Sequence, residues 1–238
     1  SAMSSREGRR PSTSDRVSRG SFPYSYSMTI DTAPGVCRLP GMPLLEEPAP
    51  RPWVVLLTGH EHHGKTEAAR WLERWEGFAR VSFADPLRKS LVALGVPVRA
   101  FEQDSKLEPL ATHGGKTPRE LMQGLGDWCR GVSPDLLSRA WDRGLPPPPA
   151  SVVADDARRE VEVEVALGAA RRRGARCAVI RVDRPGWPKG SDHGTNRIPA
   201  TPDGVDLDAS VTNDGSVADL GRAVVALLRA AAETGDRS

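Results

Sequence analysis

The stretch WVVLLTGHEHHGKT, residues 53–66, decides the fold of this 238-residue chain. It opens with a continuous apolar run at residues 53–57, which is typical of a strand buried in a parallel sheet. A glycine-rich turn follows, and residues 65–76 then carry apolar side chains at helical spacing. A strand and a helix on either side of the spacing G-x4-G-K-T together predict a phosphate-binding loop.

The chemistry of this loop follows from its residue types. Gly59 and Gly64 permit backbone torsions that direct successive N–H groups at one point, and the helix N-terminus adds partial positive charge. Lys65 is expected to reach the β- and γ-phosphates, and Thr66 to offer its hydroxyl to Mg²⁺. The predicted contacts to the nucleotide are Gly59, His63, Gly64, Lys65, Thr66 and Glu67. By itself the loop indicates binding of ATP or GTP together with Mg²⁺.

Three histidines, His60, His62 and His63, stand beside Glu61 inside the loop. His and Glu are metal ligands, so a zinc site is one interpretation. A phosphate loop turns its backbone rather than its side chains toward the nucleotide, so we expect solvent-facing histidines instead. The similar stretch GGKT at residues 114–117 lacks a leading glycine and a preceding strand, and it is predicted to be an ordinary loop.

Strand and helix patterns alternate along the rest of the chain. Further strands are predicted at residues 81–83, 151–154, 177–182 and 209–212, and further helices from residue 85, over 117–128, 133–143, 161–173 and 216–233. Asp85 and Thr117 stand at helix-capping positions, each followed by proline, and Glu120 completes a capping box with Thr117. The alternation predicts an α/β fold in which helices cover both faces of a central, mostly parallel sheet.

Composition divides the chain into a tail and one domain. Residues 1–50 are rich in Ser, Arg, Pro and Gly, and they are predicted to be disordered; residues 1–2 resemble a tag remnant before Met3. The five arginines among the first twenty residues leave a nucleic-acid arm open, but a solvated tail is favoured. Residues 51–238 form the expected domain. The net charge of +2, the absence of a membrane-spanning run or signal peptide, and three unpaired cysteines predict a cytoplasmic protein with reduced thiols.

Six segments behind the loop resemble, in order, a family of known proteins. They are FADPLR (83–88), TPRELMQGLG (117–126), WCR (128–130), DAR with a glutamate four residues on (156–162), RPG (184–186) and NDGS (213–216). Together with the loop they resemble the bacteriophage deoxynucleoside monophosphate kinases over roughly residues 53–225. The resemblance implies a P-loop kinase-like three-layer sandwich, found in the host cytoplasm if phage-encoded, that transfers the γ-phosphoryl group of ATP to a deoxynucleoside 5′-monophosphate (dNMP).

The resemblance also implies roles for individual residues. The substrate-binding candidates are Phe83, Asp85, Arg88, Arg119, Gln123, Trp128 and Asp156. Arg88 and Arg119 are expected to grip the acceptor phosphate, because the guanidinium fork binds phosphate oxygens in pairs. Trp128 either stacks on the base or packs in the core. The catalytic candidates are Lys65, Arg130 and Arg158, with Arg139 less favoured, and Mg²⁺ is assigned to Thr66 and Asp156 in preference to Asp155.

The chain departs from the family pattern at residues 193–196, where HGTN replaces the usual H-x-S-E. This leaves the base preference open, and with it two alternatives. One is a phage kinase that phosphorylates a hydroxymethylated base within DNA, and the other is an ATP-binding protein without catalysis. The arginines behind the loop argue against the second alternative. A nucleic-acid partner is not favoured, no membrane is expected, and a homodimer is left open.

Overall fold

The computed structural model describes residues 51–102, 105–187 and 199–235, so the tail expected over residues 1–50 lies outside the described residues. The strands are β1 (Trp53–Thr58), β2 (Ala79–Arg80), β3 (Val152–Ala154), β4 (Arg176–Asp183) and β5 (Leu207–Thr212). They form one sheet in the order β2-β3-β1-β4-β5, and every neighbouring pair is parallel. No described helix is long and apolar enough to cross a membrane.

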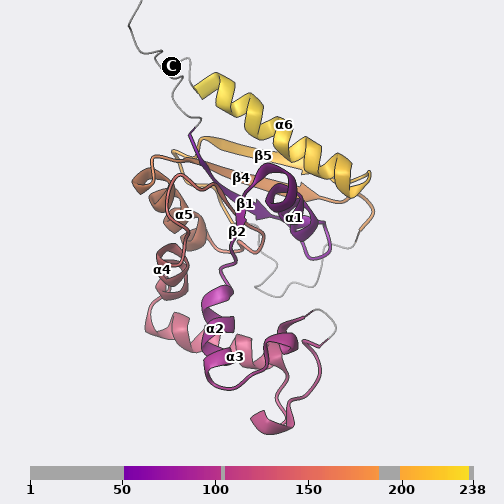
Figure 1. Ribbon diagram of the computed structural model, residues 1–238, viewed down its shortest axis with the longest axis vertical. Helices are drawn as coiled ribbons and strands as arrows, with labels where there is room; N and C mark the ends of the chain where they lie inside the picture. The colour runs from indigo at the N-terminus through magenta and orange to yellow at the C-terminus, as the bar shows by residue number, and fades with distance from the viewer. Residues whose placement is uncertain (1–50, 103–104, 188–198, 236–238) are drawn as a thin grey trace, which may run out of the picture. The chain divides into compact units, whose positions relative to one another are not determined.

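Helices cover both faces of this sheet (Figure 1). On one face lie α1 (Lys65–Glu76) and α6 (Val217–Gly235), which share a core with Val55 and Leu57 of β1. On the other face α5 (Glu160–Arg172), with Trp141 of α4 (Leu136–Arg143), packs against Val54 and Leu56. All six residues of β1 are buried, as the apolar run requires of a central strand. The predicted three-layer α/β sandwich is therefore confirmed.

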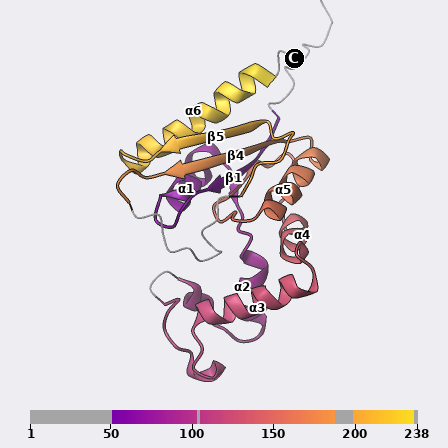
Figure 2. The same ribbon diagram turned by 180° about the vertical axis from the view of Figure 1, so that it is seen from behind.

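A helical region projects from the sheet (Figure 2). It contains α2 (Asp85–Ala93), the 3-10 helices η1 (Val98–Phe101) and η2 (Ala111–His113), and α3 (Pro118–Val132). Leu91, Val96 and Ala100 form its small core, against which Leu121 and Leu125 of α3 pack. The predicted capping box holds the start of α3, because Thr117 and Glu120 each accept from the other's backbone N–H. This packing fixes the first turns of α2 and α3, where Arg88 and Arg119 lie.

The strand predicted at residues 81–83 is displaced to Ala79–Arg80. Residues 83 and 84 instead form a turn, because their N–H groups donate to the carboxylate of Asp156 rather than to a neighbouring strand. Asp85 is also not the cap of its helix. Ala84 occupies that position, and the Asp85 carboxylate reaches back to accept from the Ser82 N–H at 2.8 Å. The two aspartates together fix the turn that leads into α2.

Candidate active site

The phosphate loop lies between β1 and α1, at the carboxyl end of the central strand. Gly59 has a φ of 123°, and a Cβ atom there would lie 2.4 Å from the carbonyl oxygen of Val182 in β4. Gly64 has a φ of 101°, and its Cβ would lie 2.5 Å from the Asn213 side-chain nitrogen. Both glycines are thus required by backbone conformation and by close neighbours. The loop, which follows β1, therefore lies against the ends of β4 and β5.

The ammonium group of Lys65 is directed into the loop. Its Nζ donates to the carbonyl oxygens of Gly59, at 2.8 Å, and His60. Burial is the main cause that lowers the Lys65 pKa to about 8, and the nearby charge of Arg158 lowers it further, while Asp155 raises it. The lysine therefore lies among charged groups from β3 and its following segment, at the centre of the candidate site.

The histidines of the loop differ from one another in exposure. His62 is exposed, as predicted, but His63 is 3% exposed, so the prediction of solvent-facing histidines is wrong for this residue. Its Nδ1 accepts from the Arg184 backbone N–H at 3.1 Å, and its carbonyl oxygen accepts from the Asn213 side chain at 2.9 Å. His63 thus anchors the loop to the segments that follow β4 and β5. The described residues contain no cluster of three His, Cys, Asp or Glu side chains suited to a metal ion.

Thr66 and Glu67 lie in the first turn of α1. The Glu67 carboxylate pairs with Arg70 at 2.6 Å, so any contact from Glu67 to a nucleotide would come from its backbone. Thr66 is partly exposed, as a residue must be to offer its hydroxyl to a metal ion. Mg²⁺ usually takes only one or two protein ligands besides phosphates and water, and hydroxyl and carboxylate oxygens suit it. Thr66 and a carboxylate at the end of β3 therefore fit this ion.

The two aspartates after β3 have different surroundings. Asp156 accepts three hydrogen bonds, from the Ser82 hydroxyl and the N–H groups of Phe83 (2.9 Å) and Ala84 (3.1 Å). Burial is the main cause that raises its pKa. Both carboxylate oxygens are engaged by the turn before α2, so the assignment of Asp156 to Mg²⁺ and substrate is revised to a positioning role. Asp155, whose charge acts on Lys65, is the better candidate for the metal; one of its oxygens pairs with Arg80 at 2.9 Å.

The two aromatic candidates have different surroundings. Phe83 is 4% exposed and its ring stacks on Trp141 with the centroids 4.4 Å apart, so the interpretation of Phe83 as a substrate contact is wrong. It belongs to the core beneath the turn. Trp128 is 66% exposed on α3, which excludes the alternative that it packs in the core. Gln123 is exposed on the same helix, one turn beyond Arg119, as the spacing predicts.

A cluster of three cations lies opposite the loop, and one of them was not found from the sequence. Lys106 interacts electrostatically with Arg88 of α2 and Arg119 of α3; its pKa is lowered chiefly by burial and then by these two charges. Glu61 of the loop and Asp155 act on it in the opposite direction. The Arg119 N–H also donates to the Lys106 carbonyl oxygen at 3.2 Å. Lys106 follows no recognisable motif, and only the fold brings it to this place.

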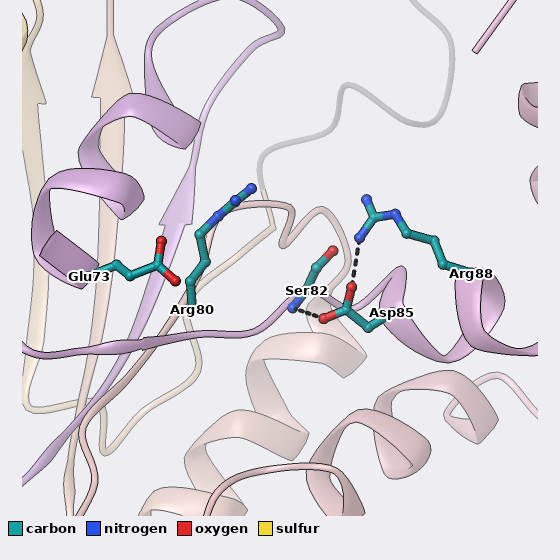
Figure 3. A pocket seen from close by; sticks show the side chains of 5 residues that line it. All are labelled: Glu73, Arg80, Ser82, Asp85 and Arg88. Atoms are coloured by element: carbon teal, nitrogen blue, oxygen red, sulfur yellow. Dashed lines mark hydrogen bonds and ion pairs between the residues drawn. The ribbon is translucent and has the colours of Figure 1, made fainter. Parts of the chain in front are cut away.

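A polar cavity of about 130 Å³ adjoins this cluster (Figure 3). It is lined by Glu73, Arg80, Ser82, Asp85 and Arg88. Asp85 lies between Ser82 and Arg88 and pairs with Arg88 at 2.7 Å, while Arg80 extends from β2 between this pair and Glu73. The cavity therefore presents charged and hydroxyl groups at the edge of the sheet, where a sugar or a phosphate can be bound.

The remaining arginine candidates lie in different places. The charge of Arg158 acts directly on Lys65, and its backbone N–H donates to Glu162 at 2.7 Å, so Glu162 steadies it beside the loop. Burial raises the pKa of Glu162 to about 7. Arg130 pairs with Asp127, and it lies about 16 Å along α3 from Arg119 at 1.5 Å per residue, so the structure does not bring it to the cluster.

Arg139 of α4 pairs at 3.3 Å with Asp135, the residue before this helix. This ion pair agrees with the expectation that Arg139 is a less favoured catalytic candidate than Arg130 and Arg158. The departure from the family pattern at residues 193–196 lies outside the described residues. The site that the fold assembles therefore consists of the loop with Lys65, the residues Asp155 and Arg158 that follow β3, and the cluster of Arg88, Lys106 and Arg119.

Comparison with known proteins gives one relative in sequence. A protein of Acanthamoeba polyphaga mimivirus, described provisionally as a deoxynucleotide monophosphate kinase, is 32% identical over 156 residues, which cover 58% of this chain and 77% of the relative. No protein-family model matches the chain. Among solved structures, a provisionally described kinase of Chloroflexus aurantiacus is 15% identical with a TM-score of 0.47, covering 77% of this chain and 99% of its own. The Mycobacterium tuberculosis APS kinase in complex with AMPPNP and APS is 20% identical with a TM-score of 0.39, covering 76% and 99%.

Proposed function

This chain belongs to the family of the deoxynucleotide monophosphate kinases, and from that premise we propose that it transfers the γ-phosphoryl group of ATP to the 5′-phosphate of a dNMP. ADP and a deoxynucleoside diphosphate are then the products. Such an enzyme acts where its nucleotides are found, in the cytoplasm of the cell. The observation that carries the proposal is the cluster of Arg88, Lys106 and Arg119, which the packing of α2 on α3 and the hydrogen bond from the Arg119 N–H to the Lys106 carbonyl oxygen hold together.

Three like charges from separate segments repel one another, and among the described residues only Arg88 of the three has a carboxylate partner, Asp85 at 2.7 Å, so holding them together costs free energy in the folded protein. A phosphate dianion bound among them offsets that repulsion. The loop supplies a second, separate site for the phosphates of ATP. Two adjacent polyanion sites are what transfer between two phosphate groups requires, since the reaction depends chiefly on positioning and on neutralising charge. A protein that only bound ATP would gain nothing from the second site.

In the proposed reaction an oxygen of the acceptor 5′-phosphate attacks the γ-phosphorus, and the bond from that phosphorus to the β–γ bridging oxygen breaks. The acceptor is ionised, so no base is required to remove a proton. Lys65 neutralises charge on the transferring group, and Arg158, whose charge acts on Lys65, is our candidate to act on the same group. Bound Mg²⁺, held by Thr66 and Asp155, would supply further positive charge at the β- and γ-phosphate oxygens. Asp85, which lines the polar cavity, is our candidate to accept from the sugar hydroxyl.

Selection of the base remains a prediction from the residues on α3. Gln123 can hydrogen-bond a base edge, and the exposed ring of Trp128 can stack on a base. The competing substrate, a hydroxymethylated base within DNA, is tested in the same experiment. The protein is incubated with Mg-ATP and each dNMP in turn, then with duplex DNA containing hydroxymethylated bases, while ADP release is followed. Release with a free dNMP supports the proposal, whereas release only with DNA, suppressed steeply by salt, supports the alternative.

Separate removal of two cluster cations is expected to weaken acceptor binding selectively. Arg119→Ala and Lys106→Ala should each raise the KM for the dNMP about tenfold or more, because each removes a charge-assisted contact to the acceptor phosphate, while the KM for ATP changes less than about twofold. Steady-state kinetics with each substrate varied in turn measures both values. Arg99→Ala, an exposed arginine of η1, is the matched control and should leave both unchanged. An equal rise in both KM values would remove Arg119 and Lys106 from the acceptor site.

ATP binding is expected to take up protons at mildly alkaline pH. The folded protein holds the Lys65 pKa at about 8, below the ordinary value of 10.5 for lysine, so about half of the lysine is neutral at pH 8. A bound triphosphate raises this pKa and draws a proton from solvent. Uptake should grow from pH 7 to pH 9 and disappear below pH 7, where Lys65 is already protonated. Calorimetric titration with ATP, in buffers of different ionisation enthalpy, measures the number of protons; zero uptake at pH 9 would contradict the assignment of Lys65 to the phosphates.

A further inference from the structure

The sequence Arg184-Pro185-Gly186-Trp187 forms a tight turn directly after β4. The Trp187 N–H donates to the Arg184 carbonyl oxygen at 3.3 Å, and Gly186 has a φ of 73°. Proline at the second position and a positive φ at the third are the signature of a type II turn, in which glycine is strongly favoured at the third position. Such a turn brings its first and fourth side chains together. Here these are the guanidinium and the indole.

The two side chains form an exposed cationic and aromatic surface. The Arg184 guanidinium carbon lies 4.3 Å from the centroid of the Trp187 ring, and Trp187 remains 45% exposed. In the part of the chain that the structure describes, no carboxylate forms an ion pair with Arg184. Leaving a large aromatic ring in water is unfavourable, and a cation over its face strengthens its attraction for a further planar group. The surface is therefore suited to a flat, π-rich ligand.

This surface is attached to the phosphate loop. The backbone N–H of Arg184, the first residue of the turn, donates to His63 at 3.1 Å. Just before the turn, the Val182 carbonyl oxygen lies so near Gly59 that no side chain fits there. Asn213, after β5, holds the same loop through the His63 carbonyl oxygen. The turn thus flanks the loop on the side of β4 and β5.

The order of the strands decides which part of a nucleotide this side receives. The loop follows β1 in the middle of the sheet, and the cation cluster belongs to segments that follow β2 at one edge. With the acceptor phosphate on the β2 side, the transferred γ-phosphate must face that side, and the rest of the donor must extend away from it. The β4 and β5 side remains for the nucleoside of the donor.

We propose that Trp187 and Arg184 form the binding surface for the base of the donor nucleotide, a purine that stacks on the indole. The inference rests on the proposed kinase function, because it takes the phosphates of ATP to occupy the loop. Stacking recognises the flat face of a base rather than the groups at its edge, so the surface accepts purines generally and favours them over the smaller pyrimidines. The RPG segment therefore contributes to the base site through the turn that it forms and through Trp187, the residue that follows it.

The test compares ATP with inorganic tripolyphosphate, which carries the phosphates without a base. Calorimetric titrations with Mg²⁺ are made on the wild type, Trp187→Ala and Trp187→Phe. Loss of one stacking surface should raise the Kd for ATP about tenfold in Trp187→Ala and less in Trp187→Phe, while the Kd for tripolyphosphate stays within about twofold. Trp75→Ala is the matched control, because Trp75 is also exposed and lies 5.1 Å from an arginine, Arg74, on α1. It should bind both ligands as the wild type does.

Three results would overturn the base site. They are an unchanged Kd for ATP in Trp187→Ala, an equal loss for ATP and tripolyphosphate, or equal affinities of the wild type for the two ligands. In each of these cases the wild type still binds phosphates and the kinase proposal stands. Failure of the wild type to bind either ligand would instead reject the phosphate loop as an ATP site, and both proposals with it. Arg184→Ala, which retains the backbone contact to His63, should weaken ATP binding several-fold without affecting tripolyphosphate.

Discussion

Replacing Lys65 by alanine is expected to lower kcat by about 10³-fold, the largest effect on activity of any substitution in the chain. The Lys65 ammonium lies inside the loop, bound to the Gly59 and His60 carbonyl oxygens, from where it can follow the γ-phosphate as negative charge moves during transfer. A group that acts more strongly in the transition state than in the ground state affects kcat rather than substrate binding alone. ADP release in the presence of the preferred dNMP measures the effect.

Two comparisons make this prediction specific. Lys89→Ala removes an exposed lysine from α2 and should retain full activity. Circular dichroism of Lys65→Ala should match the wild type, because the alanine side chain fits within the volume of the lysine stem. Survival of more than about a tenth of the wild-type kcat in Lys65→Ala would mean that phosphoryl transfer occurs elsewhere in the molecule.

Replacing Asp156 by alanine is expected to lower the free energy of unfolding by about 3–5 kcal/mol. The substitution leaves three donors without their acceptor, namely the Ser82 hydroxyl and the N–H groups of Phe83 and Ala84. Each unsatisfied buried donor costs about 1–3 kcal/mol, although water entering the space will recover part of this. Urea unfolding, followed by tryptophan fluorescence, measures the change from the shift of the midpoint.

Asp156→Asn distinguishes a positioning role from a metal-binding one. The amide retains one acceptor oxygen, so stability should be only partly lost, and the loss of activity should appear mainly as a higher KM for the dNMP, because the turn positions Asp85 and Arg88. Asp127→Ala, an exposed aspartate on α3, is the control and should change neither quantity. A stable Asp156→Ala variant whose activity is restored by raised Mg²⁺ would return Asp156 to the metal site.

Much of the fold could be predicted because its signals are local. The buried strand, the glycine spacing and the helix of residues 53–76 are contiguous, and the Thr117 capping box depends on four residues only. The displaced strand at residues 81–83 shows the limit of this reasoning. Its apolar pattern is real, but the N–H groups of residues 83 and 84 are bound by an aspartate more than 70 residues away in the sequence, which no local pattern reveals.

The structure favours Asp155 over Asp156 for the metal, and the sequence did not indicate this for a related reason. Side chains alternate between the faces of a strand, so two neighbouring aspartates at its end point in opposite directions. Val153 packs on the face that carries α1, and Asp155, two residues on, pairs with Arg80 and its charge acts on Lys65 of α1. Sequence spacing supported Asp156, but only the arrangement of α1 and α5 about the sheet identifies the side on which the loop lies. Lys106 was missed because no spacing links a lysine in an irregular segment to two arginines on different helices.

Phe83 and His63 illustrate how a correct motif can misassign a side chain. Both stand in segments that matched expectations, yet Phe83 contributes its ring to the core and His63 its imidazole to a backbone contact. A short motif shows which residue type a position requires. That requirement can come from packing as well as from contact with a ligand. The exposed fraction of the side chain in the folded protein distinguishes a residue that packs from one that contacts a ligand.

The central position of β1 also has a consequence for how the chain folds. Its residue Val54 pairs with Val152 on one side and with Cys177 on the other. Either pairing closes a segment of roughly a hundred residues, and the entropy of that closure is lost before the parallel contacts compensate for it. We therefore expect β1 to remain unpaired during synthesis until β3 and β4 have emerged from the ribosome. During that interval its five apolar residues, Trp53 to Leu57, are exposed to aggregation, and we expect a chaperone to protect them.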